Sequence, residues 1–398
     1  MIIHISGRIT YVNSRALSIC SINRDTADPP GSRIGRDENG EPNGVLFEKN
    51  AQKLVESKIP PPTREQALIG AKKASDTLIN VGITSVCDAL VGCGIDWELS
   101  LDTYQESMDK GIFKVRVCAH LFSEIQDEFT TKGIKITVPS DYLKIRATKI
   151  VSDGSIQGHT AYLLDSYNDK TDTAGFPTLT EDQIYERVKK ANEIGFQVST
   201  HANGDAAIGE VINAYGRVIK EKKLSGHRYR IEHCQMVNES QLKTMSELGI
   251  CATFFNNHIY YWGDRHRDLF LGEKRANRID PLNSALKHKI KFGLHSDWPI
   301  TPPNPIKNID IAVNRKTSSG KVLGQEECIG IKDAVKAMTS NAAYVAMDDD
   351  VKGTINPGKY ADLVVLSNDP ITIPCNSIKD LEVEMTIIGG EIVYQKGK

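Results

Sequence analysis

The sequence lacks several patterns that would assign a function at once. No two histidines stand one residue apart (His-X-His), no Cys-X-X-Cys occurs, and neither Gly-X-Gly-X-X-Gly nor a Walker Gly-Lys-Ser/Thr is found. Without such loops, Gly204 and Gly209 give no indication of nucleotide binding. The eight cysteines are scattered without regular spacing. A chain of 398 residues needs no covalent cross-links to be stable, so we expect reduced thiols.

The chain also lacks a strong charge bias and long apolar runs. A formal net charge of -2 gives no reason to expect nucleic acid or an anionic membrane as a partner. No stretch approaches the roughly 18 apolar residues of a membrane span, and the first residues do not resemble a signal peptide. The composition, 40% hydrophobic and 25% charged, is typical of a soluble, cytoplasmic globular protein with room for one barrel and a smaller appendage.

From residue 63 onward, the sequence alternates between strand and helix patterns. Amphipathic stretches at 181–194, 206–222 and 239–248 predict helices, and Thr63 with Gln66 has the spacing of a helix-starting capping box. Such alternation predicts a parallel α/β barrel, one strand short of the eight that close it. The seven expected strands are 82–88, 114–121, 143–152, 196–201, 229–233, 250–255 and 290–295.

The two ends of the chain follow other patterns. In segment 1–62, Asn13 can cap a short helix, and Asn39-Gly40 between two short apolar runs indicates a β-hairpin. We interpret this segment as an inserted subdomain and segment 63–345 as the barrel. After an expected helix at 331–343, segment 346–398 has strand patterns with tight turns, which predict a small β-rich module.

Four of the expected strands lead into a side chain that can bind a metal or carry a proton. These side chains are Lys149, His201, His233 and Asp297. The carboxyl ends of parallel barrel strands meet at one rim, where such enzymes carry their chemistry. The order Lys, His, His, Asp on successive strands therefore indicates a metal-dependent hydrolase.

Five motifs in a fixed order carry a resemblance to a known family. They are Lys-Ile-Val-Ser-Asp-Gly from Lys149, His-Ala-Asn-Gly-Asp from His201, Ile-Glu-His ending at His233, Ser-Asp-Trp-Pro around Asp297, and Pro-Gly-Lys-Tyr-Ala-Asp-Leu-Val-Val-Leu from Pro357. The chain resembles the amidohydrolase superfamily. Within it, the chain is similar to the amidohydrolase-3 branch of N-substituted formamide deformylase-like enzymes, without their N-terminal part.

The resemblance implies a fold and a cofactor. It implies a (β/α)8 TIM-type barrel, here lacking its first strand, with a small C-terminal β-sandwich module. It also implies one or two divalent metal ions, commonly zinc, held by His-X-His, a lysine that is often carboxylated, two histidines and an aspartate. By motif, Lys149, His201, His233 and Asp297 match the last four roles. Because His-X-His is missing, we expect at most one ion here.

The same residues allow less specific interpretations. Each histidine alone could be a core or surface residue, Lys149 could extend its aliphatic stem along the surface, and Asp297 could cap a turn rather than act as the catalytic general base. The expected substrate-side residues follow strand ends, where they fit a loop-fixing role equally well. They are Asp153, Gln157, His159 and Trp298.

Two functional hypotheses follow. The first is hydrolysis of a carbon–nitrogen (non-peptide) bond in a small-molecule amide, formamide or cyclic amide. The second is a truncated or non-catalytic binding or scaffold relative, because one strand and His-X-His are missing. A barrel without its first strand exposes sheet edges at 82–88 and 290–295 that recruit other chains. We therefore expect homo-oligomers or aggregates with little hydrolase activity.

Overall fold

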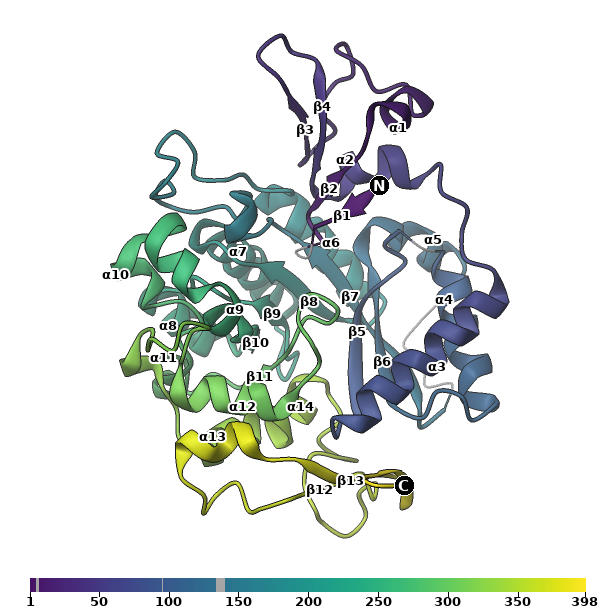
Figure 1. Ribbon diagram of the computed structural model, residues 1–398, viewed down its shortest axis with the longest axis vertical. Helices are drawn as coiled ribbons and strands as arrows, with labels where there is room; N and C mark the ends of the chain where they lie inside the picture. The colour runs from purple at the N-terminus through teal and green to yellow at the C-terminus, as the bar shows by residue number, and fades with distance from the viewer. Residues whose placement is uncertain (5–6, 95, 134–139) are drawn as a thin grey trace.

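The computed structural model describes residues 1–4, 7–94, 96–133 and 140–398. A curled parallel sheet with its helices forms the body of the molecule, a small subdomain from the N-terminal segment lies at one end, and a small C-terminal sheet lies at the other (Figure 1). Within these residues, no helix is both long and apolar enough to cross a membrane.

The central sheet has seven parallel strands in sequential order, which confirms the predicted barrel-type fold. In the described part of the chain, β5 and β11 form the two ends of this sheet. Each observed strand overlaps one of the seven expected, with ends shifted by up to three residues. The strands are β5 (Ser85–Val91), β6 (Arg116–Phe122), β7 (Leu143–Val151), β8 (Gln197–Ala202), β9 (Arg230–His233), β10 (Cys251–Phe254) and β11 (Phe292–Leu294).

Helices connect the strands and several begin at the caps that the sequence indicates. Thr63 and Gln66 form the predicted capping box at the start of α3, and Thr180 and Asn238 make the same arrangement at α6 and α8. The helices of the body are α3 (Arg64–Asn80), α4 (Trp97–Asp109), α5 (Gln126–Thr131), α6 (Glu181–Glu193), α7 (Asp205–Lys222), α8 (Glu239–Leu248), α9 (Asn257–Arg265), α10 (Gly272–Ala276), α11 (Leu282–Lys287) and α12 (Pro305–Asn314).

The N-terminal subdomain contains the predicted capped helix and hairpin. Asn13 accepts a hydrogen bond from the backbone of Ala16 and begins α1. Strands β3 and β4 pair antiparallel on either side of the Asn39-Gly40 turn, and the sequence did not indicate the two short strands before them. The sheet order is β1-β2-β4-β3, built from β1 (Ile2–Ile3), β2 (Ile9–Tyr11), β3 (Arg33–Arg36) and β4 (Pro42–Phe47), with α1 (Ser14–Ile19) and α2 (Glu48–Glu56).

The C-terminal part differs from expectation at two places. The single helix expected at 331–343 is wrong, because the backbone breaks at Thr339 (φ -127°, ψ -94°) and two helices form, α13 (Ile331–Met338) and α14 (Ser340–Val345). In the segment 346–398, where the sequence indicates strands with tight turns, residues 353–362 form turns and irregular backbone, and the first strand begins only at Leu363. The β-rich module itself is present as an antiparallel sheet of β12 (Leu363–Leu366), β13 (Val383–Ile388) and β14 (Glu391–Gln395).

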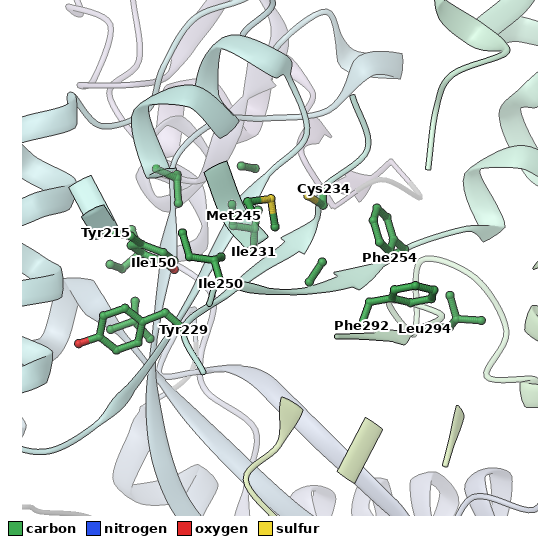
Figure 2. Close-up of a cluster of buried hydrophobic side chains, with 14 of the residues drawn as sticks. Ile150, Tyr215, Tyr229, Ile231, Cys234, Met245, Ile250, Phe254, Phe292 and Leu294 are labelled. Atoms are coloured by element: carbon green, nitrogen blue, oxygen red, sulfur yellow. The ribbon is translucent and has the colours of Figure 1, made fainter. Parts of the chain in front are cut away.

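The main hydrophobic core lies between the parallel sheet and its helices. Figure 2 shows side chains of β7, β9, β10 and β11 packed with Tyr215 of α7 and Met245 of α8. Phe254 and Phe292 meet edge to face with ring centroids 5.3 Å apart. In β9, Ile231 joins this core, whereas its neighbours Arg230 and Glu232 alternate to the opposite face of the sheet. That face is the concave side of the curved sheet, and we call the space it encloses the interior of the curl.

We predict that Ile231→Ala lowers the free energy of unfolding by about 2–5 kcal/mol, because Ile231 is fully buried and its loss leaves a cavity in a close-packed core. Urea denaturation followed by circular dichroism measures this. The matched control is Ile355→Ala, at a side chain that is 86% exposed, where a change within about 0.5 kcal/mol is expected. Equal losses in the two variants would contradict this account of the core.

Candidate metal and active site

Strand register brings three of the predicted residues together. Val151, two residues after Lys149 on β7, pairs with His201 of β8, and Ala202 pairs with His233 of β9. The two imidazole rings meet edge to face with centroids 4.4 Å apart. Lys149, His201 and His233 are all buried. They line one cavity of about 1370 Å³, together with Asp297, which follows β11 and is exposed to that space.

Both histidines are held in the neutral form that binds metals. Burial keeps the pKa of His201 well below its ordinary value, and the cations Arg8 and Lys149 add to the effect. Burial likewise lowers the pKa of His233, with smaller contributions from neighbouring His201 and His295. A neutral imidazole offers a lone pair, whereas an imidazolium does not.

Hydrogen bonds determine which nitrogen carries the lone pair. Nε2–H of His201 donates to the carbonyl oxygen of Gly154 at 2.9 Å, which leaves Nδ1 as the acceptor. Nδ1 of His233 is buried without a hydrogen-bond partner. An orphaned ring nitrogen beside a second neutral imidazole fits a divalent metal ion, so His201 and His233 would be its first two ligands.

Lys149 and Asp297 lie beside this pair. Burial lowers the pKa of Lys149 to about 8, although Glu232 and Asp297 favour its charged form. Asp297 follows the buried strand β11, and its charge also acts on His258 and His295. In the part of the chain that the structure describes, the ligand atoms of Asp297, His201 and His233 do not all lie within 4.8 Å of one another. Coordination by Asp297 would therefore require its side chain to move inward.

One side chain of the N-terminal subdomain, Arg8, contacts the site. Arg8 lies at the end of the segment before β2, and its Nη2 donates to Nδ1 of His201 at 3.1 Å. Its Nη1 donates to the buried carboxylate of Glu48, the first residue of α2, also at 3.1 Å. Burial raises the pKa of Glu48, while Arg8 opposes that effect. The guanidinium thus contacts the nitrogen of His201 that a metal ion would need.

The four expected substrate-side residues occupy different places. Asp153 is fully buried, and its carboxylate accepts hydrogen bonds from the backbone of Tyr162, Asn203 and Gly204. Gln157 and Trp298 line the cavity.

His159 lies 3.0 Å from the carboxylate of Asp169 and packs against Tyr167 and Phe270. Neither Asp153 nor His159 is among the described cavity-lining residues. The contacts of His159 favour the loop-fixing alternative, whereas Oδ1 of Asp153 also lies 3.4 Å from Nε2 of His201 and so contacts the site from behind that ring.

Several site residues were not singled out from the sequence. His258 and His295 surround His233 at ring-centroid distances of 6.3 and 4.9 Å, and Arg230 donates to Glu232 at 2.6 Å beneath it. Arg230 and Lys149 hold the pKa of Glu232 below its ordinary value even though burial opposes ionisation. The alternation of charged and apolar residues in β9 was a usable signal for this pair, and His295 stands only two residues before Asp297.

The backbone is strained at three residues of the site. Glu48, His233 and Asp297 have φ values of 66°, 70° and 49°, in the left-handed region that side chains rarely adopt. Each such conformation costs roughly 1–3 kcal/mol and persists where its surroundings enforce it, most often at functional sites. Strain at two predicted ligands and at the partner of Arg8 is consistent with a site whose geometry is imposed by the fold.

Comparison with known proteins places this geometry in a family. Residues 1–394 match the amidohydrolase family. "Putative amidohydrolase YtcJ" of Bacillus subtilis is 30% identical over 395 residues, which cover 97% of this chain and 72% of that protein. The N-substituted formamide deformylase of Arthrobacter pascens is 25% identical over 398 residues, covering 97% and 71% of the two chains.

A solved structure supports the fold. The crystal structure of an uncharacterized metal-dependent hydrolase from Pyrococcus horikoshii has a TM-score of 0.74 with this chain at 24% identity, and the match covers 93% of this chain and 71% of that one. The parallel strand order, the sequence relatives and the family match agree along almost the whole length. The chain therefore belongs to the amidohydrolase family.

Proposed function

We propose that this protein is a metal-dependent hydrolase that cleaves the carbon–nitrogen (non-peptide) bond of a small amide, formamide or cyclic amide. The observation that carries the proposal is the pair of buried, neutral imidazoles of His201 and His233 beside Asp297 in one cavity. Family membership and the likeness to a formamide deformylase support the class of bond.

Each of these side chains would have a separate role in the reaction. His201 and His233 would hold a divalent ion, with zinc as the expected metal, and Lys149 would join them if carboxylated. A divalent ion at such a site polarises the scissile carbonyl and lowers the pKa of water. The Asp297 carboxylate would accept the proton of the attacking water at one oxygen and pass it to the leaving nitrogen. Gln157 and Trp298 line the same cavity, where they would contact the substrate.

One observation favours the second candidate function, a non-catalytic relative. Arg8 donates a hydrogen bond to Nδ1 of His201, and a bound cation would stand close to the guanidinium charge. Two unit charges about 4 Å apart at an effective dielectric constant of about 20 repel by roughly 4 kcal/mol. Metal binding therefore requires Arg8 to move, and a chain in which it stays would be a binding or scaffold protein.

We predict that His201→Ala and His233→Ala each weaken divalent metal binding by at least tenfold, because a site with few ligands cannot replace one of them. Equilibrium dialysis of metal-stripped protein against Zn²⁺, followed by elemental analysis, counts the ions held per chain at each free concentration, so the loss of this one site appears as one ion fewer whatever other site the chain keeps. His288→Ala is the matched control, since this partly exposed histidine contacts Glu239 and neither residue is among those that line the cavity. If both site variants bind like the control, the two histidines are not ligands.

We predict that Arg8→Met strengthens Zn²⁺ binding by about tenfold, because removing the guanidinium frees Nδ1 of His201 and removes the charge repulsion. A tenfold change in affinity corresponds to about 1.4 kcal/mol, which is less than the roughly 4 kcal/mol of repulsion between the two charges. Isothermal titration calorimetry would compare it with Arg15→Met, an exposed arginine of the same subdomain. Unchanged or weaker binding in Arg8→Met would show that Arg8 does not compete with the ion, and would remove the main argument for the non-catalytic alternative.

We predict that Asp297→Asn abolishes turnover while retaining most of the bound metal, because the amide keeps the size and one oxygen but cannot accept a proton. The assay is release of formate or amine from a panel of N-formyl amines and simple amides. Asp268→Asn, on an exposed residue paired with Arg267, serves as the control. Turnover by Asp297→Asn equal to that of the control would refute the general-base role.

A further inference from the structure

A second group of ligand-type side chains lies deeper in the curled sheet than Lys149. Cys87 is on β5, and Cys118 and His120 are on β6. The parallel register pairs Cys87 with Cys118, and His120 stands two residues farther along β6, so the three side chains share one face. On the neighbouring strand β7, His120 pairs with Ala147, two residues before Lys149.

The spacing of these side chains fits one metal ion. The two sulfur atoms and an imidazole nitrogen lie within 4.8 Å of one another, and in the described part of the chain no other three histidine, cysteine or acidic residues do. Zinc binds sulfur at about 2.3 Å and nitrogen at about 2.0–2.1 Å, so its tetrahedral ligands lie roughly 3.5–4 Å apart. Small rotations of the three side chains would therefore complete the coordination.

The surroundings orient the imidazole and favour the thiolate form at Cys87 but not at Cys118. Nδ1 of His120 is 3.0 Å from the hydroxyl oxygen of Ser199, a contact that fixes the ring as an outer partner does for metal-bound histidines. The Cys118 thiol donates toward Cys87 and, with the nearby Arg230 cation, holds the pKa of Cys87 well below its ordinary value. The pKa of Cys118 is raised correspondingly, because it keeps the shared proton and is buried.

The charges and the path of access also suit a cation. Arg230 forms an ion pair with Glu232, but its Nη2 also lies 3.3 Å from Nε2 of His120, so an ion at that nitrogen requires the guanidinium to turn aside. Two thiolates would then balance the charge of one divalent ion. Cys87 is exposed, and the main cavity reaches both Cys87 and Cys118, which gives an ion a way in. Two sulfurs and one imidazole select thiophilic metals over Mg²⁺ or Ca²⁺, which prefer oxygen ligands.

We propose that Cys87, Cys118 and His120 form a binding site for a thiophilic metal ion of the Zn²⁺ type, separate from the pair His201 and His233. On binding, the remaining S–H bonds break, two metal–sulfur bonds form, and the displaced protons pass to solvent. The proposal depends on the geometry of β5 and β6 and stands whether or not the protein is a hydrolase.

The experiment is an anaerobic titration of metal-stripped, reduced full-length protein with Co²⁺, whose thiolate complexes show a sulfur-to-metal charge-transfer absorption. We expect this band to saturate at one Co²⁺ per chain, to bleach when Zn²⁺ is added, and to vanish in Cys87→Ser and Cys118→Ser. His120→Asn should weaken binding by at least tenfold. Cys93→Ser, a cavity-lining cysteine outside the group, is the matched control and should keep the full band.

A double variant, His201→Ala with His233→Ala, separates the two sites, because it should lose the other ion and retain the thiolate band. Near-ultraviolet circular dichroism verifies that each variant is folded, and the wild-type titration decides the question even if one variant is not. Absence of the band in wild type overturns the proposal, as does a band that persists in both cysteine variants. Recovery of the protein with a Cys87–Cys118 disulfide that excludes Co²⁺ would overturn it too.

Discussion

The in-register hydrogen bonding of parallel strands is the constraint on which the site depends. Each strand of the central sheet pairs with the next one in sequence, so the carboxyl ends of β7, β8 and β9 lie side by side. A slip of one residue would turn His201 or His233 from the interior of the curl toward the helices. The hydrophobic residues between the sheet and its helices prevent such a slip, because the same shift would carry Ile231 out of the core.

Inside the curl, buried charges determine which groups are protonated. Arg230 keeps Glu232 ionised, and the pair in turn lies beside Lys149. Cations near the two histidines add to the effect of burial and keep both rings neutral. A buried charged pair contributes little net stability, since desolvation offsets the Coulomb attraction. The interior charges are therefore better explained by the chemistry of the site than by folding.

The sequence predicts most of the fold and the rim of the site, and both for local reasons. A short strand with β-branched residues, followed by a capped helix, is a local signal, so the seven strands and the caps at Thr63 and Asn13 could be found. The break at Thr339 was missed because an amphipathic pattern continues across it. Whether the molecule forms homo-oligomers stays a prediction, since a single chain does not test it.

Contacts between segments far apart in sequence were beyond prediction. Arg8 meets His201 across 193 positions, and the cysteines at 87 and 118 become neighbours only through the pairing of β5 with β6. Neither pair leaves a spacing that a reader of the sequence could test. The same strand register that aligns the predicted ligands also creates these pairs. Side chains that could bind a metal ion therefore lie at more than one level of the sheet, and motifs at strand ends reveal only the outermost level.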